Sequence, residues 1–298
     1  MIEIPDYEMY VANAMSELKD QFTFAHRLYD GWMLVEKDRY IIESKLDPLV
    51  IRLSMTLNVQ ACRQFRSIIE LCERGEATNA MIVGRSLYET AVALMFVLSP
   101  QVPIRVKQKS GKTDAWQAEI HDPQLASNSF TNRLRAALYL SSTVFNDERC
   151  YLKWNKRAEL QQMANVVKPG QALVDFCERE IGKEWSFILR HRPHTFSGLS
   201  LAELTKALGN NLDLYYDTVY HLFSRMAHAA DAIRHASDNN GCFGPQWWSS
   251  VDDICGGLQA GSQVFLASTK ILQNNFGFGT DTDSKLDELI ANFHKVFA

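Results

Sequence analysis

One stretch of this chain, residues 78–98, constrains the fold more than any other. It reads TNAMIVGRSLYETAVALMFVL, has the length of a helix and is apolar all round, yet it holds two charges one turn apart, Arg85 and Glu89. A helix without a polar face is normally buried. Buried ions persist only when they are paired and hydrogen-bonded, because desolvation costs roughly several kcal/mol per ion. We therefore predict a buried central helix over about 77–98, and we expect polar partners for this charged pair elsewhere in the chain.

The best candidates for these partners lie on a predicted helix at 211–237. Its polar side chains recur every three or four residues and therefore share one helix face. These residues are His221, Ser224, His228, Asp231 and His235. The face carries neither Lys nor Glu, and alanines flank it, so that another helix could approach closely. We predict that this face meets Arg85 and Glu89 and forms the polar centre of the protein.

The whole chain has a helical pattern. Apolar residues recur with a helical period, and the breaks fall at Gly, Pro and Asn rather than at regular hairpin spacing. This pattern predicts an all-α helical bundle, in which short links such as the one at Gly75 make successive helices antiparallel neighbours. We expect N-terminal helices over 1–48 that pack on the core, a bundle core over 49–240 with an insertion at 100–130, and C-terminal helices of the same domain over 241–298.

The region near 102–120 breaks the helical pattern. It alternates apolar and polar residues around Ser110-Gly111, which is typical of a small β-hairpin, although a loop fits the same composition. The region carries a basic cluster in which Arg105 and Lys107 are candidates for binding a phosphate group. Short runs of surface charge are usually only solvated, so this ligand-binding role is an alternative to a plain solvated surface.

Composition and charge argue against several classes of protein. With 46% hydrophobic and 22% charged residues, the chain of 298 residues is typical of a globular protein in water. A net charge of −4 gives no general attraction to nucleic acid or to an anionic membrane. The opening residues MIEIPDYEMY lack the basic and apolar regions of a signal peptide. We therefore expect a cytoplasmic protein that does not bind a membrane.

The sequence shows no recognisable metal or cofactor site. Its six cysteines form no C-x-x-C pair, and no histidine has a glutamate three residues before it, as di-iron bundles require. His228, Asp231 and Glu89 could together hold one ion, but Arg85 beside them would repel a cation. We therefore expect neither a metal nor a cofactor.

The order of these motifs resembles a known family. Arg-Ser-Leu-x-Glu lies on the apolar helix. A short helix follows, which starts with the capping pattern Ser200-x-x-Glu203 and ends in Leu208-Gly209. Then come Tyr216, Tyr220, Ser224 and His228 in a Tyr-x-x-x-Ser-x-x-x-His frame. Over about 50–240 this order is similar to the bacterial helical proteins catalogued as domain of unknown function 5677. The resemblance implies an all-α bundle with one shared polar site, made by Arg85, Glu89, Tyr220, Ser224 and His228. The family name implies no reaction.

Two functions fit this site. In the first, Arg85, Glu89, Ser224 and His228 form a buried network that is structural or that binds a ligand or partner, with Tyr220, His221 and Asp231 as further binding residues. In the second, the protein is a metal-independent ribonuclease of the HEPN kind from a toxin or phage-defence system, in which Arg85 holds a phosphate and His228 acts as acid or base. That class normally places Arg four to six residues before His on one helix, whereas Arg225 lies only three residues before His228, so the active site would have to be assembled across helices. We favour the first function, with a homodimer and RNA as candidate partners and catalysis left open.

Overall fold

The structure is a computed structural model that describes most of the chain. The described residues are 6–37, 46–99, 102, 104, 128–182, 185, 188–189, 195–209, 212–226, 236–239, 242–245, 249–276 and 280–297. Within them the fold is an all-α bundle with one short hairpin, which confirms the predicted fold class. The chain forms two compact units: unit 1 comprises 1–44, 57–92 and 214–298, and unit 2 comprises 45–56 and 93–213. The division into domains that we expected from the sequence stays a prediction.

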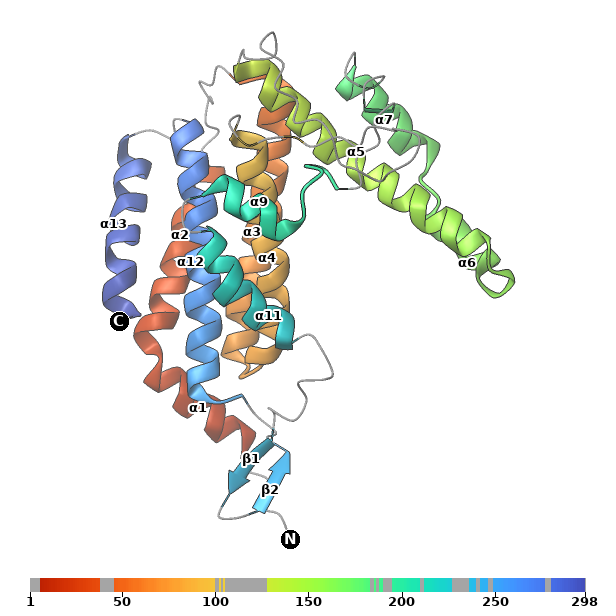
Figure 1. Ribbon diagram of the computed structural model, residues 1–298. Helices are drawn as coiled ribbons and strands as arrows, with labels where there is room; N and C mark the ends of the chain where they lie inside the picture. The colour runs from red at the N-terminus through yellow and green to blue at the C-terminus, as the bar shows by residue number, and fades with distance from the viewer. Residues whose placement is uncertain are drawn as a thin grey trace. The chain divides into compact units, whose positions relative to one another are not determined.

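Unit 1 is built from long helices that lie side by side (Figure 1). Two of them, α3 and α4, continue into unit 2. Its elements are α1 (Tyr7–Glu17), α2 (Lys19–Lys37), α3 (Pro48–Glu73), α4 (Ala77–Leu98), α10 (Leu212–Tyr215), the π-helical turn η3 (Tyr216–Tyr220), α11 (His221–Met226), β1 (Ala236–Asn239), β2 (Cys242–Pro245), α12 (Val251–Asn275) and α13 (Thr280–Val296).

The helices α3 and α12 approach each other closely because α12 carries glycines at the contact. The rings of Phe65 and Phe265 stack with centroids 4.5 Å apart and planes 12° apart. One turn before Phe265, a Cβ on Gly261 would lie 3.1 Å from the nearest atom of Ile68. A larger residue there would push the two helices apart, since interiors are packed with few voids.

Helix α4 is the central helix, as predicted. Residues 91–99 are all buried, which places the second half of the helix inside the protein. Among the described residues, α4 is the one helix that is long and apolar enough to cross a membrane, and 72% of its most apolar window is buried here. Such burial is typical of a core helix. Its first half differs, because one narrow stripe that includes Ile82 is partly exposed.

The described part of unit 2 adds four helices to the ends of α3 and α4. They are α5 (Asn128–Asn155), α6 (Gln161–Val167), α7 (Gln171–Ile181) and α9 (Leu201–Leu208), with the short 3-10 turn η2 (Ala158–Leu160) between α5 and α6. Helix α9 begins with the capping box that the sequence predicts. The amide of Glu203 donates to Ser200 Oγ at 3.3 Å, and the amide of Ser200 donates to Glu203 Oε2 at 2.9 Å.

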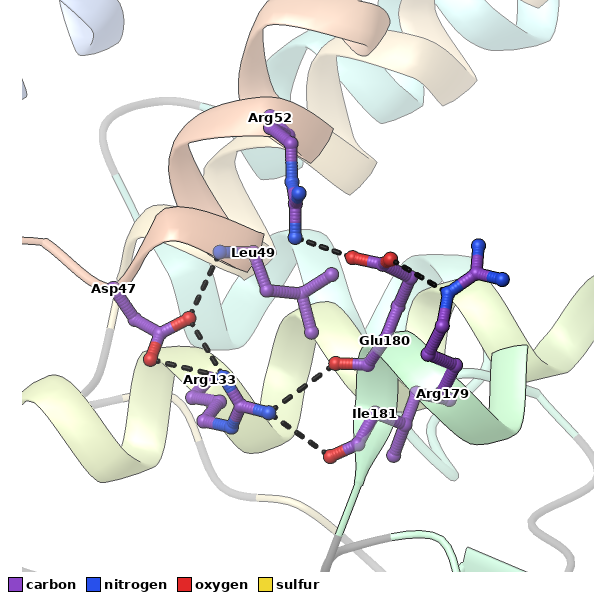
Figure 2. A network of polar contacts seen from close by, with 7 residues as sticks. All are labelled: Asp47, Leu49, Arg52, Arg133, Arg179, Glu180 and Ile181. Carbon is purple, nitrogen blue, oxygen red and sulfur yellow. Dashed lines mark hydrogen bonds and ion pairs between the residues drawn. The ribbon is translucent and has the colours of Figure 1, made fainter. Parts of the chain in front are cut away.

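A network around Arg133 of α5 ties two helix ends together in unit 2 (Figure 2). Its Nη1 donates to both carboxylate oxygens of Asp47, at 2.9 and 3.0 Å, and Asp47 Oδ1 accepts from the amide of Leu49 at the start of α3. Its Nη2 donates to the last carbonyls of α7, those of Glu180 and Ile181, at 3.2 and 3.0 Å. One guanidinium therefore donates hydrogen bonds both to the carboxylate that caps the start of α3 and to the carbonyls at the end of α7.

For two segments the structure does not confirm the sequence prediction. Of the region near 102–120, in which we expected a β-hairpin or a loop, the structure describes only Val102 and Ile104. The continuous helix expected at 211–237 is wrong at its end, where Ala236–Asn239 is a strand paired with Cys242–Pro245. The register pairs Asn239 with Cys242, so that Asn-Gly falls between the strands, and this dipeptide favours two-residue hairpins.

Candidate functional site

Arg85 and Glu89 lie on the stripe of α4 that the bundle leaves open. Their side chains are 37% and 48% exposed, so the prediction of a buried ion pair is wrong. The stripe runs through Ile82, Arg85, Ser86 and Glu89, which follow one another at helical spacing, while their neighbours on the other faces are mostly buried. The apolar composition of α4 showed that the helix is central. It could not show that the surrounding helices leave one side of α4 partly exposed.

Tyr220 of η3, which follows Glu89 by 131 positions in the sequence, contacts this pair. Its hydroxyl donates to Glu89 Oε1 at 3.1 Å, and Arg85 Nε donates to the same oxygen at 3.2 Å. The guanidinium carbon of Arg85 also lies 5.2 Å from the centroid of the Tyr220 ring, within the range of a cation–π contact. Each of the three side chains thus contacts the other two.

Further aromatic rings hold Tyr220 in place. The half-exposed ring of Tyr216 stacks on it, with centroids 5.0 Å apart and planes 15° apart. The fully buried ring of Tyr88 lies 5.4 Å away, and the ring of His221 meets Tyr216 edge-on at 5.1 Å. We name the group formed by Arg85, Glu89, Tyr216 and Tyr220 the α4–η3 site. Both of its tyrosines belong to a π-helical turn, a rare element that often occurs at functional sites.

Close packing places η3 and α11 against α4. Phe223 of α11 is 1% exposed and forms a small cluster with Met81 and Ala260, against which Val219 packs. The ring of Phe223 lies over Gly84, where a Cβ would be only 2.6 Å from the nearest ring carbon. Gly84 therefore allows the two segments to approach closely, and this approach brings Tyr220 to Glu89.

The electrostatics of the site keep Tyr220 neutral and Arg85 charged. Burial raises the pKa of Tyr220 above its ordinary value of 10.0; the charge of Glu89 and the hydrogen bond to it raise it further, while Arg85 and a hydrogen bond with Ser224 lower it. Burial lowers the pKa of Arg85, but the hydrogen bond and charge of Glu89, together with Tyr220, raise it more. At neutral pH the phenol is therefore a donor to a carboxylate that also binds a guanidinium.

The raised pKa of Tyr220 predicts a loss of stability at alkaline pH. Its protonated form is favoured in the folded protein, so its contribution is complete below about pH 10 and is lost as the pH rises through the higher pKa of the folded state. The difference in ultraviolet phenolate absorbance between the wild type and Tyr220→Phe measures this titration. We expect the Tyr220 phenolate to form above pH 10 and the Glu89→Gln change to lower its pKa. Titration at or below pH 10 would contradict the geometry.

Replacing Arg85 with methionine should hardly change stability. Because both members of the ion pair are more than one-third exposed, solvent screens their attraction, and we expect the free energy of unfolding to change by less than about 1 kcal/mol. Urea denaturation of the wild type and Arg85→Met measures the difference. A loss of several kcal/mol would show that the pair is structural after all.

The structure brings part of the predicted site together. Arg85, Glu89 and Tyr220 are in contact, the half-buried Ser224 hydrogen-bonds to Tyr220, and the exposed His221 lies against Tyr216. Four predicted site residues fall outside the described residues and stay predictions: Arg105, Lys107, His228 and Asp231.

Sequence reasoning left Tyr216 and Tyr88 out of the predicted site residues. The spacing of Tyr216 from Tyr220, four positions on a predicted helix, was a signal for a stacked pair. Tyr88 gave no such signal, because a tyrosine within an apolar run is indistinguishable from core. In the described part of the chain, no group of three His, Cys, Asp or Glu side chains is placed to hold a metal ion.

Beyond the site, the sequence is similar to a known protein family. A family model described as a family of unknown function (DUF5677) matches residues 52–243, which is more than half of the chain and includes both α4 and η3. No significantly similar protein is found among curated proteins or among solved structures. The chain belongs to this family of unknown function, DUF5677.

Proposed function

We propose that this chain is a non-catalytic binding protein and that its α4–η3 site receives a group from a ligand or partner. The observation that supports this proposal is the combination of exposure and order at the site. Arg85, Glu89 and Tyr216 are all partly exposed, yet each is held by the contacts described above. Side chains that are already fixed lose little conformational entropy when a ligand binds, which favours affinity.

Stability alone does not explain this arrangement. Exposed ion pairs contribute roughly 0–1 kcal/mol, so the protein gains little from placing Arg85 beside Glu89. The π-helical turn is a rare departure from regular α-helix. An accessible set of donors and acceptors beside such a turn is better explained by recognition than by folding.

The proposal includes a cytoplasmic location. Cys72, Cys150, Cys177 and Cys255 are free thiols in the structure, and free thiols are typical of proteins in a reducing compartment. A homodimer is among the partners that the proposal allows.

A ligand screen by thermal shift tests the proposed function. The purified full chain is screened against amines, nucleotides and short peptides, and each compound that raises the melting temperature is tested on Tyr216→Leu. We expect Tyr216→Leu to reduce the shift and the control Phe176→Leu, which removes an exposed ring from α7, to retain it. Ligands whose shifts are unaffected by Tyr216→Leu would place recognition elsewhere and contradict the proposal.

A metal-independent ribonuclease is the alternative function, and the exposure of Arg85 supports it, since an exposed guanidinium can reach a phosphate. The proposed acid or base, His228, lies outside the described residues. The integrity of cellular RNA after expression of the wild type or His228→Ala tests this function. Fragmentation with the wild type alone would support the nuclease, and intact RNA in both would count against it.

A further inference from the structure

The charged side chains of α4, α10 and η3, all described by the structure, are mostly acidic. On α4, α10 and η3 the acids are Glu89, Asp213 and Asp217, and the one base is Arg85. Both Asp213 and Asp217 are exposed on consecutive turns, and the charge of Arg85 is largely balanced by Glu89. Charges that lie within about 8 Å of an approaching ligand, the Debye length at physiological salt, attract or repel it.

The site already holds a cation of the protein itself. The guanidinium of Arg85 lies over the Tyr220 ring and donates to Glu89, so an aromatic face and a carboxylate bind one cationic group together. The Arg85 guanidinium and the Tyr220 hydroxyl both donate to Oε1 of Glu89, whose side chain is 48% exposed. The neighbouring Tyr216 offers a second, half-exposed ring, and Asp217 follows it in the chain.

We propose that the α4–η3 site binds a cationic group, either a guanidinium or an alkylammonium, with Tyr216 as its aromatic face and with Glu89 and Asp217 as its acceptors. This inference rests on the proposed function and names the chemical class of its ligand. Aromatic rings attract cations through their negative faces, and acids beside the ring strengthen that attraction. The same acids repel phosphates, so the site disfavours nucleotides and RNA. The cation can come from a free polyamine or from a basic side chain of a partner.

Isothermal titration with four probes tests this inference. The probes are spermine, an arginine-rich octapeptide, a glutamate-rich octapeptide of the same length, and a ten-nucleotide single-stranded RNA. The full chain is titrated at low and at physiological salt. We expect spermine, the arginine-rich peptide or both to bind, the two anionic probes not to bind, and the affinity to fall as salt increases. Preference for spermine indicates a free polyamine, and preference for the peptide indicates a partner protein.

Two variants and two matched controls locate the binding. Tyr216→Leu should weaken binding of the cation about threefold to tenfold through loss of the ring, and Asp217→Asn about twofold to fivefold at low salt. The controls Phe176→Leu and Glu178→Gln remove an exposed ring and an exposed charge from α7 and should leave the affinity unchanged. Circular dichroism confirms that each variant is folded.

The outcomes separate the inference from the proposed function. Binding of RNA or the glutamate-rich peptide that depends on Arg85 would overturn the cationic ligand class and leave the α4–η3 site as a binding site. Cation binding that is insensitive to both site variants would overturn the inference as well, because the cation would then bind elsewhere. If none of the four probes binds, the inference is overturned as well.

Discussion

Replacing Phe223 with alanine is expected to lower the free energy of unfolding by about 3–5 kcal/mol, the usual cost of removing a buried phenylalanine. Phe223 is 1% exposed, and its ring packs against Met81, Ala260 and Gly84. The substitution leaves a cavity where η3 and α11 meet α4. Urea denaturation followed by circular dichroism measures the loss. A loss below about 1 kcal/mol would contradict the close packing described here.

The contact between Phe223 and Gly84 can be tested from its other side. A Cβ at Gly84 would lie 2.6 Å from the ring, so Gly84→Ala should cost about 1–3 kcal/mol by overpacking. In the double variant with Phe223→Leu, the smaller side chain should relieve part of that cost, so that the two losses do not add. The control is Gly256→Ala in α12, where the added Cβ would meet no atom within 4 Å other than those of the adjoining residues and the local helix backbone. It should be neutral or stabilising by about 0.5–1 kcal/mol, because alanine favours the helix.

Replacing Arg133 with methionine is expected to lower the free energy of unfolding by about 2–4 kcal/mol. The guanidinium is 25% exposed and its carboxylate partner Asp47 is 21% exposed, so solvent screens them only in part. Removing Arg133 leaves Asp47 with one fewer partner and the carbonyls of Glu180 and Ile181 without this donor. Breaking a buried pair typically costs about 3–5 kcal/mol, and we reduce that range for the partial exposure.

A matched change separates this network from ordinary surface charge. Arg52→Met removes a guanidinium that is 63% exposed and bound to Glu180, so it should cost less than about 1 kcal/mol. Equal losses for Arg133→Met and Arg52→Met would show that the contacts of Arg133 to the helix ends are not structurally important.

The general fold follows from local sequence signals. The apolar composition of α4 predicts its central place, and Ser200-x-x-Glu203 predicts the start of α9 because both capping hydrogen bonds are local. The pairing of Arg85 with Glu89 also follows from spacing alone, since residues four apart share a helix face. These features depend on contacts within one helix or on the total burial of one helix.

Features set by distant contacts could not be predicted in the same way. The exposure of Arg85 and Glu89 depends on which faces of α4 the other helices cover, and the sequence of α4 alone does not determine this. The π-helical turn gives no sequence signal that distinguishes it from α-helix, and it interrupts the helix expected at 211–237. The helical pattern of the alanines continues to Ala236, so it extends the predicted helix into the strand Ala236–Asn239, and the signal that favours the hairpin is the Asn-Gly that follows the strand.

The central claim is that the α4–η3 site is a binding site, and nuclear magnetic resonance of tyrosine rings tests it most directly. The ring signals of Tyr216 and Tyr220 in selectively labelled protein are assigned with Tyr216→Phe and Tyr220→Phe, and then followed while spermine, the arginine-rich peptide and the RNA are added in turn. We predict that at least one ligand shifts both signals to saturation while the buried Tyr88 changes less. Signals of Tyr216 and Tyr220 that none of the three ligands moves would contradict the account.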